Sequence, residues 1–188
     1  PHFLAVGRFC HTKAPMLTVL AFEKVLKSIP TATLTIMGND DGGVLESTLS
    51  LIKALGIEGN VKTINGASPE EVLIQMHKAS IFVQHSITTP INGDKEGTPV
   101  SVMEAMATGL PVVATRHAGI AEVIENGKTG ILINEFDVNS MAAEMVGLYQ
   151  NRDKMKQIGS EASKFIHSNP LIADHNEKLA DLIDKIKA

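Results

Sequence analysis

Residues 96–115 read EGTPVSVMEAMATGLPVVAT, and this stretch decides the fold because it contains both ends of a helix and the strand that follows. Thr98 is a suitable N-cap residue, and Pro99 suits the first helical position. Gly109, with a proline two residues later, ends the helix before the β-branched run Val112–Thr115. The stretch therefore predicts a helix that leads directly into a strand.

Short apolar or β-branched runs recur along the chain and predict strands. These runs are Phe3–Val6, Thr33–Met37, Val61–Ile64, Ile81–Val83, Val112–Thr115 and Gly130–Ile133. Segments with helical spacing separate them, the first beginning at Pro15, and further helices are expected over Val138–Tyr149, Asp153–His167 and about Leu171–Lys187. Strands joined by crossover helices are parallel, and continuous apolar strands need cover on both faces. The sequence thus predicts an α/β fold, a three-layer α/β/α doubly wound parallel sheet of the Rossmann-like type.

The composition excludes several classes of protein. With 188 residues, 44% of them apolar and 20% charged, the chain has the size of a single globular domain over residues 1–188. The net charge of -4 leaves no general basic surface for nucleic acid or an anionic membrane. The single Cys10 excludes an internal disulfide framework, so a buried thiol in a reducing compartment is expected. No run of 18 uncharged apolar residues occurs, so no membrane-spanning helix is predicted.

The loop after the first predicted strand carries two cations, Arg8 and Lys13, immediately before a helix. Ligands of open parallel sheets bind beyond the carboxyl ends of the strands, where helix N-termini converge. Arg8 offers a two-pronged guanidinium and Lys13 a compact charge, so the pair is a candidate clamp for a phosphate. The alternative is two solvated loop charges, because neither GxGxxG nor GxxxxGK[ST] occurs in the sequence.

Glu104 lies, with Ser101 and Thr108, on the polar stripe of an otherwise apolar predicted helix. A carboxylate in such surroundings is costly to desolvate without a hydrogen-bonding partner. The vicinal hydroxyls of a ribose suit one carboxylate, and the free N–H groups of Val100 and Ser101 at the helix start suit a diphosphate. Glu96, in the preceding loop, is placed to reach a group beyond that phosphate. The alternatives are a structural acceptor at Glu104 and an exposed loop charge at Glu96.

The stretch 96–115 resembles the E-x7-E signature of the large retaining glycosyltransferase family that uses nucleotide-activated sugars, known as glycosyl transferases group 1, with the GT-B fold. Other motifs agree with this resemblance. Gly7-Arg8 and Lys13 are similar to the family's GR-x4-K, and Gly119 with Glu122, followed by Thr129, Gly130 and Leu132, to its G-x-x-E and next strand. The resemblance covers essentially the whole chain as the C-terminal, donor-binding half of a two-domain fold, and implies that the N-terminal acceptor domain is absent from this chain.

The resemblance also implies roles for individual residues. Arg8 and Lys13 would bind the donor diphosphate, and together with Glu96, which would contact hydroxyls of the donor sugar, they form the expected catalytic set. Glu104 would bind the ribose hydroxyls. The donor-binding set is completed by residues at the helix start, namely Gly97, Thr98, Val100 and Ser101.

By the same resemblance, the expected activity is that of a retaining, metal-independent glycosyltransferase of the hexosyltransferase type. It would take a UDP- or GDP-linked sugar without a cofactor, and its cations would stabilise the departing diphosphate, since the sequence has no Asp-x-Asp motif. The resemblance further implies a glycan or lipid-linked acceptor and a role in bacterial polysaccharide or lipopolysaccharide biosynthesis. The expected location is cytoplasmic, with the full-length protein at the inner face of the membrane.

Two other functions are weighed against this one. The chain alone would be a nucleotide-sugar binding module that binds donor weakly and transfers little sugar, because it lacks the acceptor wall that aligns the reacting atoms. A dinucleotide-dependent oxidoreductase is disfavoured by the missing glycine fingerprint.

Some features depart from the family or carry no functional prediction. Ala14-Pro15 follow Lys13 where the family often has glycine, and residues 85–95 form a longer loop than the minimal one, so donor-sugar selectivity is expected to differ here. His85 near the presumed cleft is expected to be a hydrogen-bonded loop histidine. Other histidines show no zinc-ligand spacing and are expected to be structural or surface residues: His77, His117 and His167.

Overall fold

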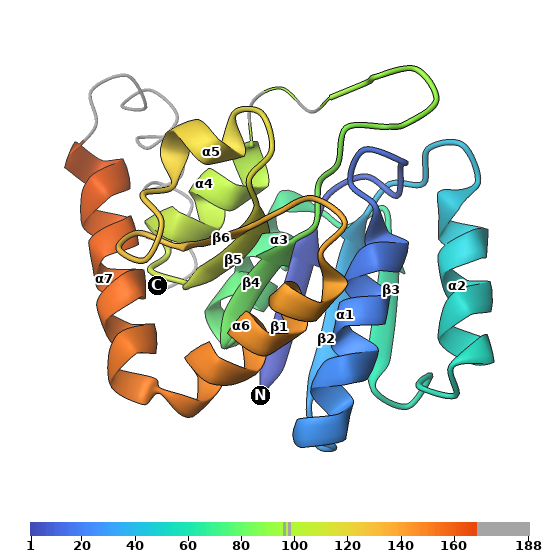
Figure 1. Ribbon diagram of the computed structural model, residues 1–188, viewed down its shortest axis with the longest axis horizontal. Coiled ribbons are helices and arrows are strands. Elements are labelled where there is room, and N and C mark those ends of the chain that lie inside the picture. The colour runs from blue at the N-terminus through green and yellow to red at the C-terminus, as the bar shows by residue number, and fades with distance from the viewer. Residues whose placement is uncertain (96, 98, 169–188) are drawn as a thin grey trace.

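A computed structural model describes residues 1–95, 97 and 99–168 (Figure 1). Within these residues, six strands form one sheet: β1 (His2–Val6), β2 (Thr33–Gly38), β3 (Val61–Asn65), β4 (Ile81–Gln84), β5 (Val112–Thr115) and β6 (Ile131–Ile133). All neighbouring strands are parallel, in the order β3-β2-β1-β4-β5-β6. The strand order reverses between β1 and β4, which is where a sheet of this kind opens a ligand-binding crevice.

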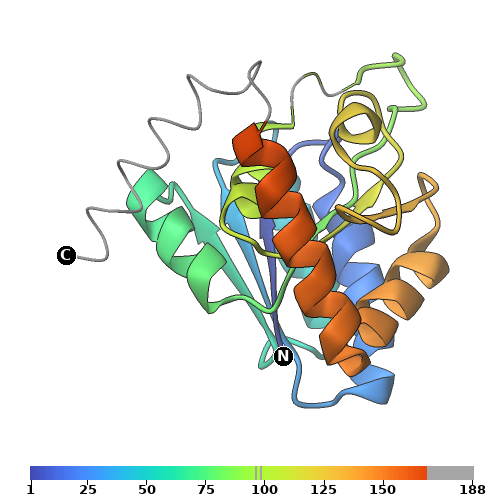
Figure 2. The same ribbon diagram turned by 90° about the vertical axis from the view of Figure 1, so that its left-hand side faces the viewer.

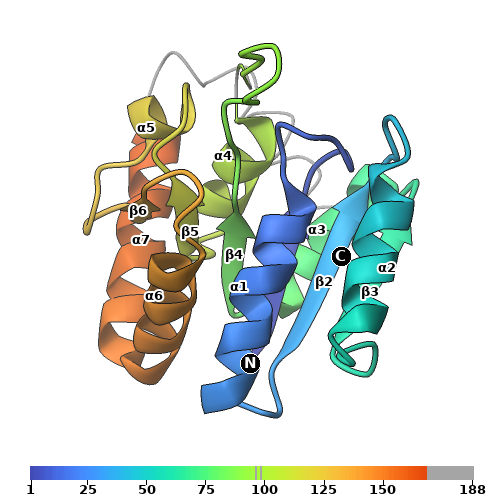
Figure 3. The same ribbon diagram turned by 45° about the vertical axis from the view of Figure 1, so that its right-hand side comes forward.

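Helices cover both faces of the sheet. They are α1 (Pro15–Ser28), α2 (Val44–Ala54), α3 (Pro69–Lys78), α4 (Val100–Ala107), α5 (Ile120–Val123), α6 (Val138–Gln150) and α7 (Arg152–Ser168). One face is covered by α1, α2 and α6, and the other by α3 and α4 (Figures 1 and 3). Figure 2 shows α7 lying across α4. The predicted three-layer α/β/α architecture is confirmed.

The apolar strands explain the two layers of core. Successive strand residues point to opposite faces, so Phe3 and Ala5 of β1 enter the core beneath α1, while Leu4 between them enters the core beneath α4. In β4, Ile81 enters the core beneath α1 and Phe82 the core beneath α4. An apolar residue at every strand position therefore requires helices on both sides.

The predicted elements agree closely with the structure. All six predicted strands are present, and their ends differ by at most one residue from those expected. Helix α1 begins at Pro15 as predicted, and α6 and α7 also lie where expected. The helix expected over 171–187 lies outside the described residues. Among the described residues, no helix combines the length and apolar character that crossing a bilayer requires.

The start of α4 differs from the prediction by one position. Pro99 is the N-cap, with a ψ angle of 64° that is not helical, so the first helical residue is Val100. Thr98, the predicted N-cap, lies outside the described residues. The predicted end of α4 is confirmed, because Thr108 is the C-cap and Gly109 adopts a left-handed φ of 78°.

A backbone contact between α7 and the end of α4 fixes how these helices cross. A Cβ atom placed on Gly159 of α7 would lie 2.2 Å from the carbonyl oxygen of Gly109, and no such contact is tolerated. Gly159 is buried in α7 at this crossing. Only the absence of a side chain lets the two helices approach so closely.

We predict that Gly159→Ala lowers the free energy of unfolding by about 1–3 kcal/mol, because the helices must separate to admit the methyl group. The matched control is Gly147→Ala in α6, where an added Cβ would meet nothing within 4 Å. This control should raise stability by about 0.5–1 kcal/mol through helix propensity. Urea unfolding of both variants checks the prediction, and equal effects would contradict it.

Candidate functional site

A pocket of about 570 Å³ opens at the carboxyl edge of the sheet, beside the switch point between β1 and β4. The β1–α1 loop contributes Arg8 and Thr12 to one wall, and the β2–α2 loop adds Asp41. The opposite wall is formed by the β4–α4 loop, including Asp94 and Gly97. We call this cavity the switch-point pocket. Its position is the one at which the sequence predicted a ligand.

The β1–α1 turn that carries both predicted cations is held by backbone contacts to the end of β2. The Gly7 N–H donates to the Met37 carbonyl oxygen at 2.8 Å, and the Phe9 N–H donates to that of Asn39 at 2.8 Å. A Cβ on Gly38 would lie 2.0 Å from the Gly7 carbonyl oxygen, so only glycine fits there. The parallel pairing of β1 and β2 therefore continues beyond the strands and fixes the turn.

Lys13 folds back over Gly7, the glycine of the GR-x4-K motif. A Cβ on Gly7 would lie 3.0 Å from both Cδ and Cε of Lys13, so glycine leaves the space that the lysine stem occupies. Arg8 and Lys13 both line a small cavity beneath this turn, of about 20 Å³. The structure thus brings the two predicted cations to the same turn.

Arg8 forms an ion pair that sequence reasoning did not predict. Its Nη1 atom lies 2.6 Å from Oδ2 of Asp41, and both side chains are more than half exposed. Asp41 is held in place because its N–H donates to the Phe9 carbonyl oxygen at 3.0 Å. An exposed pair of this kind is worth about 0–1 kcal/mol, so a diphosphate with two negative charges can displace Asp41.

Helix α4 presents Glu104 as the sequence predicted. Val102 and Met106 are buried, whereas Glu104 is half-buried and thus not sealed in the core. An apolar residue of this helix is expected to be buried, but Val100 in its first turn is 41% exposed. Helix geometry leaves the N–H groups of Val100 and Ser101 without an intrahelical acceptor, so they remain candidates for binding an anion.

The G-x-x-E glycine positions the backbone that leads into α4. A Cβ on Gly119 would lie 2.8 Å from the Gly97 carbonyl oxygen and 3.1 Å from Cδ of Pro99. The β5–α5 turn therefore packs directly against the segment before α4, and only glycine permits this approach. Glu96 and Thr98 lie outside the described residues, and their roles remain predictions.

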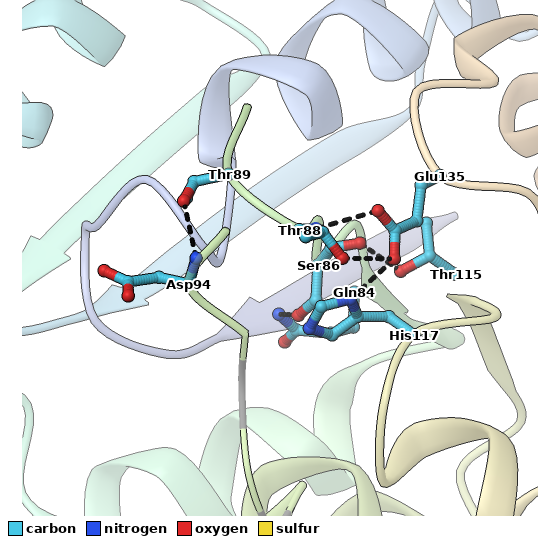
Figure 4. Close-up of polar contacts among 8 residues, drawn as sticks. All are labelled: Gln84, Ser86, Thr88, Thr89, Asp94, Thr115, His117 and Glu135. Carbon is cyan, nitrogen blue, oxygen red and sulfur yellow. Dashed lines mark hydrogen bonds and ion pairs between the residues drawn. The ribbon is translucent and has the colours of Figure 1, made fainter. Parts of the chain in front are cut away.

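A cluster of polar side chains joins the loops that follow β4, β5 and β6 (Figure 4). Oε2 of Glu135 accepts from the Thr88 N–H at 2.8 Å, and Oε1 lies 2.6 Å from Nδ1 of His117. Burial alone would raise the pKa of Glu135, but the hydrogen bonds from Thr88 and His117 outweigh burial and hold it below its ordinary value. His117 is therefore structural, one of the two roles expected for it, although the sequence did not predict Glu135 as its partner.

His85 is fully buried at the end of β4, where it lines the small cavity beneath the Gly7-Arg8 turn. Its Nδ1 atom lies 3.3 Å from Sδ of Met141, and Nε2 has no hydrogen-bond partner among the residues that the structure describes. The expectation of a hydrogen-bonded histidine is therefore met at Nδ1 and wrong at Nε2. Burial lowers the pKa of His85 to about 4, although the charges of Asp137 and Glu135 act in the opposite direction.

Two further expectations concern cysteine and metal. Cys10 is buried, as predicted, with Sγ 3.2 Å from Oγ1 of Thr12. Across the part of the chain that the structure describes, no three His, Cys, Asp or Glu side chains gather into a group that could hold a metal ion.

Comparison with known proteins identifies relatives of the chain. The family model described as glycosyl transferases group 1 matches residues 1–165. The chain is 42% identical over 117 residues to the amylovoran biosynthesis glycosyltransferase AmsK of Erwinia amylovora, which covers 62% of this chain and 28% of AmsK. It is 33% identical over 138 residues to the putative colanic acid biosynthesis glycosyltransferase WcaL of Salmonella typhimurium, covering 73% and 34% of the two proteins.

A solved structure shares the fold. TarM of S. aureus, crystallised with fondaparinux, alpha-GlcNAc-glycerol and UDP, superposes with a TM-score of 0.80 at 25% identity. The match covers 96% of this chain and 35% of TarM. The fold is that of the C-terminal half of a GT-B glycosyltransferase. The chain spans about a third of the length of AmsK, WcaL and TarM.

We predict that His85 makes stability depend on pH between about 4 and 6.5. In this range the unfolded chain binds a proton at His85 that the folded chain does not, so stability falls as the pH falls. The slope contributed by one such group is at most about 1.4 kcal/mol per pH unit. Urea unfolding from pH 7 to pH 4 should therefore show a smaller loss of stability for His85→Leu than for the original chain.

The matched control for this experiment is Met141→Leu, which removes the sulfur contact but keeps the imidazole. Its pH dependence should follow that of the original chain. An unchanged slope in His85→Leu would show that the imidazole is not held neutral by burial.

Proposed function

The chain belongs to the glycosyl transferases group 1 family, and on this premise we propose that it is the donor-binding domain of a retaining glycosyltransferase. The donor is a nucleoside-diphosphate sugar, UDP- or GDP-linked. The observation that carries this proposal is that Arg8 and Gly97 line the switch-point pocket together, one beside Lys13 and the other just before α4. One cation of the proposed clamp thus lines the same pocket as a residue close to the start of α4.

The donor diphosphate lies between Arg8 and Lys13 on one side and the N–H groups of Val100 and Ser101 on the other. Both kinds of group favour an anion, through charge and through the positive end of the helix dipole. A donor diphosphate would replace Asp41 as the partner of Arg8.

The ribose of the donor lies along the polar stripe of α4. Glu104 is four residues after Val100, so the two share one face of the helix, about 6 Å apart along its axis. A nucleotide carries its ribose next to its phosphates, so one side of α4 serves both groups. The half-buried carboxylate accepts hydrogen bonds from the ribose hydroxyls.

The sugar of the donor extends into the switch-point pocket, which Gly97 lines. By the family resemblance, Glu96 and the backbone of Gly97 and Thr98 would contact its hydroxyls. When the glycosidic bond to the diphosphate breaks, Arg8, Lys13 and the α4 dipole stabilise the negative charge on the leaving group. This stabilisation needs no metal ion and no cofactor. Glu96 has no covalent role in this proposal.

The relatives support the substrate class. AmsK and WcaL are named for the biosynthesis of amylovoran and colanic acid, which supports a role in bacterial polysaccharide biosynthesis with a glycan or lipid-linked acceptor. The TarM structure contains UDP, which supports a UDP-linked donor. The acceptor-binding N-terminal domain would belong to the part of those relatives that this chain does not span, and the enzyme would act in the cytoplasm, at the inner face of the membrane.

We predict that the chain binds nucleoside diphosphates and that Arg8→Ala weakens UDP or GDP binding about tenfold, through loss of charge-assisted hydrogen bonds. Uridine or guanosine binding should change less than twofold, because Arg8 contacts only the phosphates. Isothermal titration measures all four ligands. Arg152→Ala is the matched control, since that guanidinium stacks over Tyr149 at 4.1 Å instead. An equal effect on nucleoside and diphosphate would remove Arg8 from the clamp.

Glu104→Ala should weaken UDP and uridine alike, by about tenfold, because the ribose is common to both. Titration with the 2′,3′-dideoxy nucleoside diphosphate provides the control, since it lacks the hydroxyls that Glu104 contacts. Dideoxy ligand affinity should be the same in both proteins. A tenfold loss with that ligand too would assign Glu104 to folding rather than to ribose binding.

The alternative function is that these 188 residues alone bind a nucleotide sugar without transferring it. We predict that these 188 residues alone transfer sugar at least about a thousandfold more slowly than a full-length relative, because aligning the acceptor would require the acceptor-binding domain proposed above. Release of nucleoside diphosphate from labelled donor measures turnover in both. Comparable rates would show that this domain is sufficient for catalysis.

A further inference from the structure

Glu135 connects loops that are far apart in sequence (Figure 4). It follows β6, and both of its carboxylate oxygens accept hydrogen bonds from Thr88 in the β4–α4 loop, at 2.8 Å from the N–H and 3.3 Å from Oγ1. His117, in the β5–α5 turn, is fully buried and holds Oε1 from the other side at 2.6 Å. One carboxylate therefore ties together the loops after β4, β5 and β6.

The loop that Glu135 holds is the one that forms a wall of the switch-point pocket. Its first residues, the loop base (85–88), are bonded to neighbouring elements. The Thr115 hydroxyl donates to the Ser86 carbonyl oxygen at 2.6 Å, and the Ile87 N–H donates to that of Thr12 at 2.8 Å. The loop base is thus anchored on one side to the clamp turn and on the other to Glu135.

The residues that reach the pocket, the loop tip (89–95), are organised differently. The Thr89 N–H donates to the Asp94 carbonyl oxygen at 3.0 Å, and Nδ2 of Asn92 donates to Oδ2 of Asp94 at 2.6 Å. Every hydrogen bond that the tip makes with a described residue has its partner inside the tip. The tip is therefore a self-bonded unit that joins the anchored loop base at Thr88.

We propose that Glu135, oriented by His117, is a positioning residue for the donor sugar, because it fixes the position of the loop tip over the switch-point pocket. This inference rests on the proposed function, in which the sugar occupies that pocket. Among the described residues, Glu135 accepts hydrogen bonds from Thr88 and is bonded to His117, and neither of these is assigned to the diphosphate or the ribose. Thr88 links it directly to the loop tip, so its loss affects the sugar more than the nucleotide.

A carboxylate suits this role better than a neutral group. The hydrogen bonds from Thr88 and His117 keep the pKa of Glu135 low, so it accepts from both at neutral pH. An amide at this position still accepts from the Thr88 N–H, but it turns an N–H₂ group toward Thr88 Oγ1 and His117. Glu135→Gln therefore keeps part of the anchor, whereas Glu135→Ala removes it.

The test measures two affinities on the intact 188-residue chain, using UDP with UDP-glucose and GDP with GDP-mannose as probes. For Glu135→Ala, we expect affinity for the nucleoside diphosphate to stay within about twofold. The ratio of nucleotide-sugar Kd to nucleoside-diphosphate Kd should rise at least about fivefold. Glu135→Gln should lie between Glu135→Ala and the original chain, and Glu144→Ala in α6 is the matched control with no change.

A second measurement does not depend on the choice of sugar. Hydrogen exchange of amides in residues 88–95 should become at least about tenfold faster in Glu135→Ala, with residues 7–13 unchanged. Unchanged exchange in the tip would overturn the proposal, as would an unchanged affinity ratio accompanied only by a lower melting temperature. If the original chain binds no nucleoside diphosphate, the proposed function fails first and takes this inference with it.

Discussion

The site depends on one backbone contact, that between Gly38 at the end of β2 and the Gly7-Arg8 turn at the end of β1. A Cβ at Gly38 would lie 2.0 Å from the Gly7 carbonyl oxygen, so these two backbone segments are in direct contact. The pairing of β1 with β2 continues into the loops, because the Phe9 N–H donates to the Asn39 carbonyl oxygen beyond the ends of both strands. Arg8 is therefore presented from a rigid turn rather than from a free loop.

Helix α4 follows β4, on the other side of the switch point from this turn. Its sequence combines an apolar surface that packs against the sheet with one polar face. Most of its surface is apolar and buried, with Met106 and Val102 fully enclosed, and this burial holds the helix against the sheet. Its remaining stripe carries Glu104. The same burial that stabilises the helix fixes the direction in which its carboxylate and its first N–H groups face, so stability and binding geometry have a common origin.

Much of this arrangement could be predicted from the sequence, because the signals are local. Uninterrupted apolar runs such as Ile81–Val83 marked buried parallel strands, and the spacing of Glu104 within an apolar helix marked its polar face. Long-range contacts gave no such signal. The pairing of Asp41 with Arg8 and of Glu135 with Thr88 joins residues 33 and 47 positions apart, and only the fold shows which carboxylate reaches which donor. A helical segment was expected between Val112–Thr115 and Gly130–Ile133, but its bounds were not predicted because the four-residue α5 is too short to show a period.

The central claim is that the diphosphate of a nucleotide lies between the Arg8–Lys13 turn and the start of α4. A crystal structure of the chain with UDP tests it most directly. The account predicts phosphate oxygens within hydrogen-bond distance of the Arg8 guanidinium and the Ser101 N–H, with Asp41 released from Arg8. A nucleotide bound at the amino ends of the strands, with the Arg8–Asp41 pair intact, would contradict it.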